Sequence, residues 1–240
     1  INFRKYNKKL GGKNEDGKWR EPFDPRHSRH RQDDYTEGNA FQWSWFVPHD
    51  VEGLVDLVGG EETFAEKLDT LFSTSSELTG EEVSSDITGL IGQYAHGNEP
   101  SHHITHMYNF VGQSWKTQEL TDEIMSNLYF NDPNGLAGNE DCGQMSAWYV
   151  LNAMGFYSFN PGEPVYSIGR PIFDQVEIKL PNGRTFTVIA KNNSAENRYI
   201  QSAKLNGENL ANAFFLHEDI LAGGTLEFEM GATANKGLFN

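Results

Sequence analysis

The stretch FDQVEIKLPNGRTFTVIA, residues 173–190, decides the character of the second half of this chain. Apolar and polar residues alternate on both sides of Asn182-Gly183, a two-residue turn of the kind that joins antiparallel strands. The stretch therefore predicts a β-hairpin. Further short runs with strand character follow at residues 199–205, 213–216 and 225–230. Residues 160–240 are thus predicted to form an antiparallel, sandwich-like β region.

The period of the apolar residues changes before residue 160. Phe64, Leu68, Leu71 and Phe72 recur at helical spacing and predict a helix over residues 61–72. Similar patterns predict helices over residues 51–58, 86–94 and 144–154, one or two within 102–129, and a short one near 3–9. The predicted fold class is α+β, with a helical part (1–159) followed by a β region (160–240).

Composition excludes several classes of protein. The chain has 240 residues, a single cysteine (Cys142) and no apolar run of membrane-spanning length. Residues 1–31 carry ten Lys or Arg against four acids, whereas residues 32–240 carry nine against thirty. A body with a net charge of −21 would repel a phosphate backbone, so nucleic acid is not expected as a partner. The basic N-terminal stretch is expected to be a solvated loop.

Four polar clusters interrupt the helical part, at residues 37–50, 96–106, 112–118 and 132–144. Each combines carboxylates, amides, histidines or tryptophans. Such mixtures are typical of carbohydrate sites, where aromatic faces stack on sugar rings and carboxyl groups perform acid–base chemistry. The clusters indicate a site for a neutral sugar.

Other chemistries fit these clusters less well. His102 and His106 have the i, i+4 spacing of zinc ligands, but no Glu follows His102, so a His-dependent metal hydrolase is the weaker alternative. Residues 132–143 lack the ligands of a calcium-binding EF-hand. Cys142 precedes a predicted helix, yet a packing role is expected for it rather than nucleophilic catalysis.

The clusters, in this order, resemble those of glycoside hydrolase family 92, the exo-acting α-mannosidases. The strings that carry the resemblance are EGNAFQWSWFVPHD (37–50), HGNEPSHH (96–103), GQSWKTQ (112–118) and GLAGNEDCGQMSAWYVLNAMGFY (135–157), followed by YSIGRP (166–171) and YIQSA (199–203). The resemblance covers nearly the whole chain but only the C-terminal third of the family's length. It implies the closing helices of an (α/α)₆ barrel followed by the β region.

The resemblance also implies inverting, calcium-dependent hydrolysis of terminal α-mannosides. By carry-over, Glu37 would be the general acid and Asp141 the general base, with Glu140 as the adjacent alternative. We expect partial burial of Glu37 among Phe41, Trp43 and Trp45 to keep its proton in place.

The remaining roles follow the same carry-over. Ca²⁺ prefers oxygen ligands, and the expected ligands are Glu99, Asn98, Gln42 and Asn39 or nearby carbonyls. Side chains expected to hold the sugar are His96, Glu99, His102, His103, Trp115, Lys116 and Asn139.

One position departs from the family pattern. Members that act on α-1,2 linkages tend to carry Glu after the His of the second cluster, where this chain has Gly97. The missing side chain argues against α-1,2 specificity and leaves the α-1,3, α-1,4 and α-1,6 linkages open. The resemblance further implies a periplasmic or extracellular enzyme whose N-terminal remainder completes the site. The alternative is a carbohydrate-binding or interaction module without catalysis.

Overall fold

The structure is a computed structural model, and it describes residues 2–4 and 9–239. It is α+β and divides into two compact units. Unit 1 comprises residues 1–104 and 130–145, and unit 2 comprises residues 105–129 and 146–240. This division differs from the predicted boundary at residue 160, because the helices of residues 114–127 and 144–153 fall largely with the C-terminal strands. The domain assignment of 1–159 and 160–240 stays a prediction.

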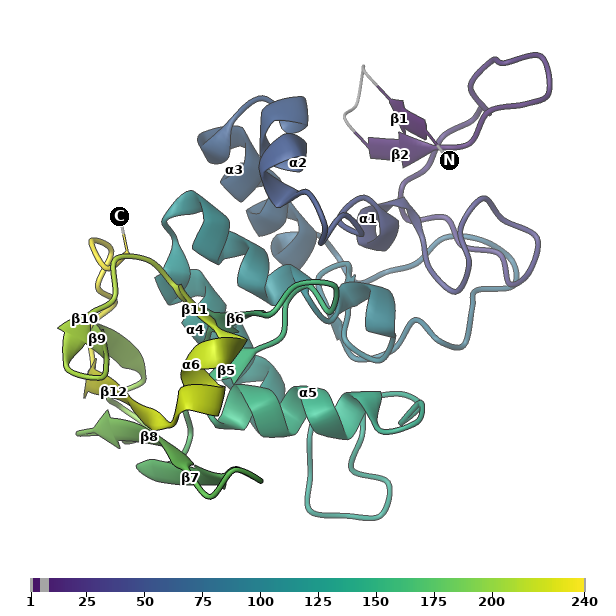
Figure 1. The fold of residues 1–240 in the computed structure, drawn as a ribbon. Coiled ribbons are helices and arrows are strands. Elements are labelled where there is room, and N and C mark those ends of the chain that lie inside the picture. The colour runs from purple at the N-terminus through teal and green to yellow at the C-terminus, as the bar shows by residue number, and fades with distance from the viewer. Residues whose placement is uncertain (1, 5–8, 240) are drawn as a thin grey trace. The chain divides into compact units, whose positions relative to one another are not determined.

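Unit 1 consists of short helices, small hairpins and long loops (Figure 1). Strands β1 (Asn2–Arg4) and β2 (Lys9–Gly11) pair where a helix was predicted near residues 3–9, and residues 5–8 lie outside the described residues. The remaining elements are α1 (Ala40–Trp43), α2 (Val51–Val58), α3 (Glu61–Ser73), β3 (Leu90–Ile91), β4 (Tyr94–Ala95) and the 3₁₀ helix η1 (Glu99–Ser101).

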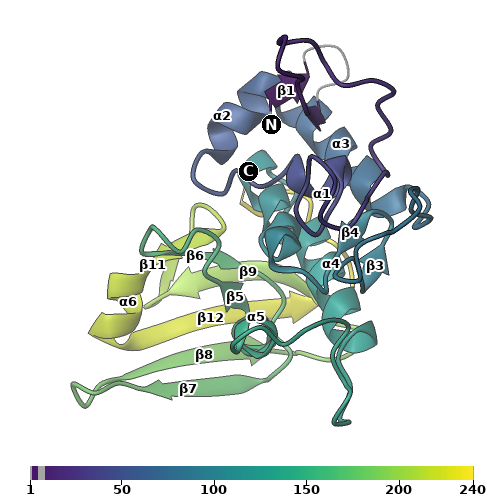
Figure 2. The same ribbon diagram turned by 90° about the vertical axis from the view of Figure 1, so that its right-hand side faces the viewer.

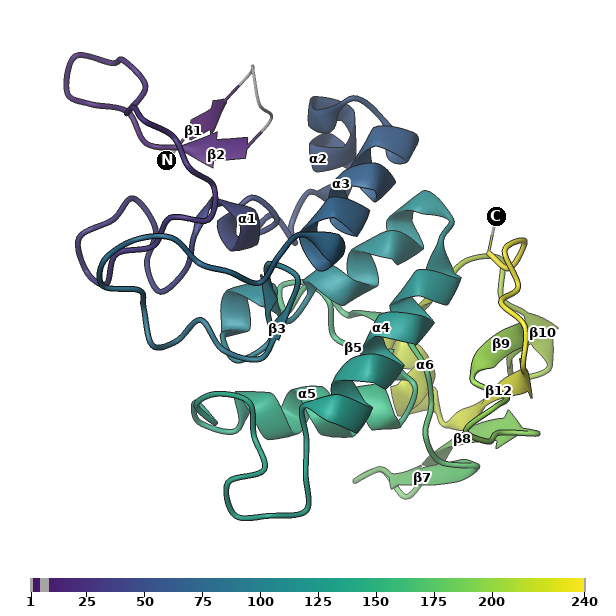
Figure 3. The same cartoon turned by 180° about the vertical axis from the view of Figure 1, so that it is seen from behind.

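The predicted helices over 51–58 and 61–72 are confirmed by α2 and α3, which pack against each other (Figure 1 and Figure 3). Asp50 Oδ1 accepts the Gly53 N–H at 2.9 Å and caps α2 at its start. Gly59, at φ 114°, ends α2 in a left-handed conformation that glycine adopts without strain.

The predicted helix over residues 86–94 is wrong, because β3 and β4 form a hairpin there. Gly89 and Gly92 have φ values of 60° and 59°. These left-handed glycines interrupt a helix and favour the turn. A Cβ on Gly92 would lie 2.4 Å from the Leu71 carbonyl oxygen, so only glycine allows this close approach to α3.

Unit 2 contains the helix α4 (Ser114–Asn127) and most of two others, the 3₁₀ helix η2 (Ile104–Val111) and α5 (Gln144–Ala153). The first residue of η2 and the first two of α5 are assigned to unit 1. These elements confirm the helices predicted within 102–129 and over 144–154. The rest of the unit consists of β5 (Phe156–Tyr157), β6 (Val165–Ile168), β7 (Gln175–Lys179), β8 (Thr185–Lys191), β9 (Tyr199–Leu205), β10 (Glu208–Asn209), β11 (Phe214–Leu216), α6 (His217–Ala222) and β12 (Gly224–Gly231).

The predicted hairpin is confirmed, with β7 and β8 antiparallel and Ile178 opposite Phe186. Gly183 has φ 81° in the turn. The order of the larger sheet is β10-β9-β12-β8-β7. Its strands β9, β12, β8 and β7 are labelled in Figure 2. The prediction of a purely antiparallel region is wrong, because β12 runs parallel to β8. α6 brings the chain back, so that β12 enters the sheet between β8 and β9.

One hydrophobic cluster joins the five-stranded sheet to the smaller sheet β11-β6-β5. Its largest fully buried side chains are Phe156, Phe186 and Phe228. Phe215 of β11 lies edge-on to Phe156 at 5.3 Å between ring centroids. These aromatic contacts hold the two sheets together, since each buried ring removes a large apolar area from water. Membership of the helices in a complete (α/α)₆ barrel stays a prediction.

This core makes a direct prediction about stability. Phe186→Ala should lower the free energy of unfolding by about 3–5 kcal/mol, because the buried ring leaves a cavity. Phe173→Ala is the control, since Phe173 is 50% exposed, and should cost less than about 1 kcal/mol. Urea denaturation of both variants measures the difference. Equal costs would contradict the assigned core.

Candidate active site

A cluster of three carboxyl groups in unit 1 is formed by Glu37, Glu99 and Asp141. The pKa of Glu99 is raised, first by burial, then by a side-chain hydrogen bond and the like charge of Asp141, and finally by the charge of Glu37. These interactions place the Glu99 and Asp141 carboxyl groups side by side, with Glu37 near enough for its charge to act on Glu99. The structure therefore brings together three acids from three polar loops that are far apart in sequence.

Two glycines allow the loops of this cluster to approach. A Cβ on Gly138 would lie 2.4 Å from the Gly97 carbonyl oxygen, and a Cβ on Gly97 would lie 1.9 Å from Thr88 Oγ1. Neither position has room for a side chain. The backbone contact holds the loop that carries Asp141 against the loop that carries Glu99.

The loop before α5 has a constrained backbone. Asp141, Cys142 and Gly143 have φ values of 48°, 58° and 95°, three consecutive residues in the left-handed region. Two of these are not glycine, and such conformations are characteristic of functional sites. The Glu140 carboxylate accepts the Gly143 N–H at the start of α5. Because Glu140 is used in this way, Asp141 is the better placed of the two acids to act on a ligand.

Asn139 and Cys142 lie in the same loop. The Asn139 side chain is exposed and donates to Asp86 Oδ1 at 3.3 Å, while Asp86 Oδ2 accepts from the Ser84 hydroxyl at 2.9 Å. Cys142 is exposed, so the expected packing role for its thiol is wrong.

Glu37 differs from expectation in its environment. Its side chain is exposed, so the predicted burial among aromatic rings is wrong. Trp43 Nε1 donates to the Thr36 carbonyl at 2.8 Å, and Trp45 packs edge-on against Phe64. These indoles are therefore engaged elsewhere. The Glu37 backbone is fixed nonetheless, because the Asn98 side chain donates to its carbonyl oxygen at 2.8 Å.

Two of the expected metal ligands cap a helix. Asn39 Oδ1 accepts the Phe41 N–H at 2.9 Å, and Gln42 Oε1 accepts the Asn39 N–H at 2.7 Å, which is a capping box for α1. Asn39 Nδ2 and Gln42 Nε2 both donate to Gln93, at 3.0 and 2.8 Å. Both side chains are thus engaged within the chain, and a metal role for them stays a prediction.

The histidines of the second cluster are buried and hold the backbone. His102 Nε2–H donates to the His96 carbonyl at 2.9 Å, and Gln144 Nε2 donates to His102 Nδ1 at 3.1 Å. His103 Nε2–H donates to the Trp45 carbonyl at 2.7 Å, and the Tyr94 hydroxyl bonds His96 Nδ1 at 2.8 Å. Burial lowers the pKa of His102 and of His103 to about 4, and that of His96 well below its ordinary value.

These neutral histidines predict a pH dependence of stability. Burial lowers the pKa of His103 to about 4 in the folded protein, against an ordinary value of 6.5. The unfolded chain therefore binds the proton more readily, and stability is lost as the pH falls from about 6.5 towards 4.

His103→Gln keeps a donor for the Trp45 carbonyl and removes the titrating ring. It should reduce the loss of stability between pH 7 and 4.5 by about 2 kcal/mol, since one pKa unit corresponds to about 1.4 kcal/mol. Denaturation of the full-length protein at both pH values measures it. His49→Gln is the control, because His49 is exposed. An unchanged pH slope in His103→Gln would contradict the buried, neutral state.

Three more of the singled-out residues lie in unit 2. Lys236 Nζ lies 5.5 Å from the centre of the Trp115 ring, and Lys116 Nζ lies 5.1 Å from that of Tyr108. His106 is fully buried and bonds Asn152 Oδ1 at 2.9 Å and Ser167 Oγ at 3.1 Å. This polar network belongs to the core. Roles for Trp115 and Lys116 in binding a sugar stay predictions.

Asp86 and Gln144 are site residues that sequence reasoning missed. Asp86 holds Asn139 beside Asp141, and Gln144 orients His102. Asp86 lies in a polar stretch that was predicted to be helical, so its residue type gave no signal of a contact fifty-three residues away. Gln144 was predicted as the last residue of the fourth polar cluster and the first residue of a helix, without a role of its own. Both contacts depend on loop packing, which periodicity does not encode.

The fit of a calcium ion can be tested on the polar atoms of this site. Glu99 Oε1 is buried and has no hydrogen-bond partner among the described residues. An unpaired carboxylate oxygen of this kind suits Ca²⁺. In residues 2–4 and 9–239, no three His, Cys, Asp or Glu side chains form a group that could hold a metal ion. A calcium ion would therefore need amide or backbone oxygens beside Glu99.

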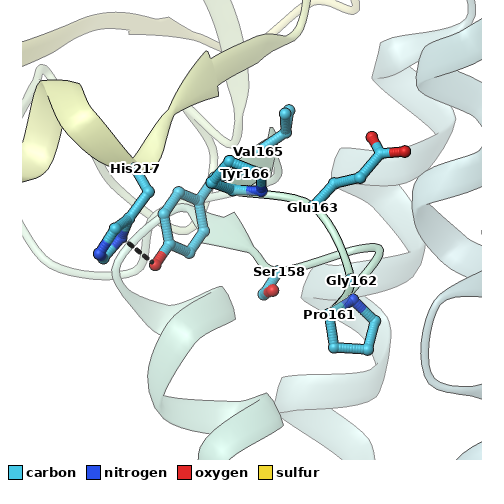
Figure 4. A pocket seen from close by; sticks show the side chains of 8 residues that line it. Ser158, Pro161, Gly162, Glu163, Val165, Tyr166 and His217 are labelled. Carbon is cyan, nitrogen blue, oxygen red and sulfur yellow. Dashed lines mark hydrogen bonds between the residues drawn. The ribbon is translucent and has the colours of Figure 1, made fainter.

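A separate hollow of about 370 Å³ lies in unit 2 around Tyr166 and His217, whose hydroxyl and Nδ1 are 3.0 Å apart (Figure 4). The Glu163 side chain extends away from this pair (Figure 4). The polar groups that line this hollow do not converge on one point. None of the sequence-predicted site residues lines the hollow.

Comparison with known proteins identifies the family. Residues 2–232 match the glycosyl hydrolase family 92 catalytic domain. The chain therefore belongs to this family, and the predicted resemblance is confirmed. No helix among the described residues is long and apolar enough to cross a membrane.

Solved structures give the same result. An α-mannosidase of this family from Bacteroides thetaiotaomicron, in complex with mannoimidazole, is 36% identical with a TM-score of 0.90, and the match covers 98% of this chain and 31% of that one. An inverting mannosidase of the family from the same organism is also 36% identical, with a TM-score of 0.83, over 98% of this chain and 32% of that one.

A curated relative is described as an uncharacterized secreted glycosidase of Arthroderma benhamiae. It is 34% identical over 203 residues, which cover 83% of this chain and 24% of the relative. The chain thus spans 24–32% of the length of these proteins.

Proposed function

We propose that this chain is the C-terminal portion of an exo-acting, inverting, calcium-dependent α-mannosidase that removes terminal α-linked mannose from glycans. The observation that supports it most is the juxtaposition of the Glu99 and Asp141 carboxyl groups, with Glu37 close enough to act on Glu99 by its charge, in a chain of family 92. The N-terminal remainder of the same enzyme is the proposed partner. Export to the periplasm or the cell exterior is proposed from the secreted relative.

In this proposal, Glu37 and Asp141 perform the acid–base chemistry. Asp141 takes a proton from the attacking water, and Glu37 gives a proton to the departing glycosidic oxygen. An inverting pair needs about 6.5–9.5 Å between its carboxyl groups to admit the water. The Glu99 carboxyl group is hydrogen-bonded to that of Asp141. The two groups are therefore too close together to admit a water molecule as an inverting pair must. Glu99 is therefore assigned to the cation and the sugar, and Glu37 to the acid.

Glu99 and Asn98 are the proposed calcium ligands, together with backbone oxygens near Asn39. Asn98 Nδ2 donates to the Glu37 carbonyl, so its amide oxygen is the atom left for a cation. Bound Ca²⁺ would supply a positive charge that holds sugar hydroxyl groups. His96, His102 and His103 then act by fixing the loops, and Asn139, Trp115 and Lys116 are proposed contacts of the glycan.

Linkages other than α-1,2 are proposed for the substrate. Thr88 Oγ1 and the Ala137 carbonyl fill the space beside Gly97, at 1.9 and 3.1 Å from a Cβ placed there. A glutamate at this position would have to displace both. The space that would hold the α-1,2-associated side chain is therefore closed.

The catalytic assignment is tested by Asp141→Asn in the full-length enzyme. Turnover of an aryl α-mannoside should fall by about 100-fold or more, because the general base is lost. Glu140→Gln is the matched control: it keeps an oxygen that can accept the Gly143 N–H and should retain turnover within about ten-fold of wild type. Sugar binding without turnover by the wild-type enzyme would support the non-catalytic module instead. Wild-type rates in Asp141→Asn would refute the role of Asp141.

The cation assignment predicts that chelation abolishes turnover and that added calcium raises the melting temperature of the full-length enzyme. Glu99→Gln should remove this thermal shift, because the unpaired carboxylate oxygen is replaced by a neutral amide. The shift should persist in Glu163→Gln, since Glu163 lies in unit 2 outside the cluster. A full calcium shift in Glu99→Gln would count against this ligand.

A further inference from the structure

A second cavity, of about 400 Å³, lies within unit 2. It is lined by residues of α4, α5, the segment before β7 and the loop between β8 and β9. Its volume falls in the range of about 300–1,000 Å³ that is usual for small-molecule sites. None of its lining residues belongs to the carboxylate cluster of unit 1.

The loop between β8 and β9 is held in one conformation by three hydrogen bonds. Asn197 Nδ2 donates to the Asn192 carbonyl at 2.9 Å, and the Asn197 N–H donates to Ser194 Oγ at 3.0 Å. Arg170 Nη2 donates to the Ser194 carbonyl at 3.2 Å. This loop carries Asn193, which lines the cavity. Its Oδ1 atom is buried and has no hydrogen-bond partner among the described residues.

An unpaired buried acceptor is costly, so a preorganised one beside a cavity favours a ligand that donates a hydrogen bond. The hydrogen bonds of Asn197 and Arg170 already order this loop before a ligand binds. A bound donor would therefore gain the hydrogen bond with little further ordering.

Two of the charged residues in the cavity wall, Arg170 and Asp122, are paired with each other. Arg170 is buried, and its Nε lies 3.0 Å from Asp122 Oδ1 while Nη1 donates to the Pro171 carbonyl at 3.3 Å. Asp122 Oδ2 lies 3.5 Å from Arg198 Nη1. Both terminal nitrogens of Arg170 donate to backbone carbonyls, and its buried Nε lies at ion-pair distance from Asp122 without forming a hydrogen bond, so the guanidinium charge is poorly available to an anion. The Asp122 carboxylate is neutralised by two arginines, so it offers little attraction to a cation.

The groups that remain suit a hydroxylated, uncharged ligand. Asn193 Oδ1 and the exposed Asp174 carboxylate can accept hydrogen bonds from hydroxyl groups, and Ser126 can donate or accept. Tyr149 supplies an aromatic wall, and its orientation is held by Tyr129, whose ring centre lies 4.8 Å away. An aromatic wall with acceptors around it matches a pyranose ring, which has an apolar face and a rim of hydroxyl donors.

We infer that this cavity is a second saccharide-binding site, which holds a neutral sugar unit of a glycan without cleaving it. The site uses no residue of the proposed catalytic machinery. It gives the protein a way to retain a branched or long glycan through two attachments, which raises the effective concentration of the chain ends.

The test uses the full-length enzyme with Asp141→Asn, so that sugar is bound and not consumed. Methyl α-D-mannopyranoside is titrated by calorimetry and by saturation-transfer NMR. Asn193→Leu in this background should weaken one binding event by about ten-fold or more, the equivalent of about 1.4 kcal/mol, and leave the other unchanged. Asn209→Leu is the matched control, because Asn209 is exposed on β10 and lies outside the cavity.

Tyr149→Ala provides an independent variant, with circular dichroism to establish that both variants fold. Loss of the same binding event in Asn193→Leu and in Tyr149→Ala supports the second site. If neither Asn193→Leu nor Tyr149→Ala changes the binding isotherm, the second site is refuted. In the otherwise wild-type enzyme, which keeps Asp141, Asn193→Leu should leave the turnover of a small aryl mannoside unchanged. Failure of the second site is thus distinguishable from failure of the proposed hydrolysis.

Discussion

The candidate active site depends on the close approach of two backbone segments at Gly97 and Gly138. With a Cβ on Gly138 only 2.4 Å from the Gly97 carbonyl oxygen, any side chain there would separate the segments. Their contact places Asp141 within hydrogen-bonding reach of Glu99. Two carboxyl groups at such a distance repel each other when ionised, and the rigid backbone holds them together against that repulsion.

Many of the polar side chains around this site hold loops in place. Gln93 binds both members of the α1 capping box, and His102 and His103 donate to backbone carbonyls. These side chains are buried, so each unsatisfied polar atom would carry a large desolvation cost. Asp141 and Glu37 are exposed by contrast. The proposed catalytic carboxyl groups thus stand on a buried polar frame, an arrangement that suits preorganised catalysis.

The sequence predicted the regular elements well where one periodicity held over many residues. The hairpin around Asn182-Gly183 and helices α2, α3 and α5 appear as expected, because their apolar positions and terminal residues agree. The helix predicted over residues 86–94 failed since Gly89 and Gly92 adopt left-handed conformations. The parallel pairing of β12 with β8 was also missed, because long-range strand order leaves no local pattern.

The residues of the carboxylate cluster were predicted from the family resemblance, whereas their supports were not. Spacing along the chain gives no sign that Asp86 holds Asn139 or that Gln144 orients His102. The expected burial of Glu37 failed because Trp43 and Trp45 have other partners. The sequence shows which side chains have suitable chemistry for a site. Packing decides which of them are already engaged in other contacts.

The contact between the two glycine-bearing segments is tested most directly by Gly138→Ala in the full-length enzyme. The added Cβ meets the Gly97 backbone, so Asp141 should shift relative to Glu99. We expect turnover of an aryl α-mannoside to fall by about 100-fold, as for misplacement of a reacting group by about 1 Å, while circular dichroism of the sheets stays unchanged. Wild-type turnover in Gly138→Ala would contradict the account.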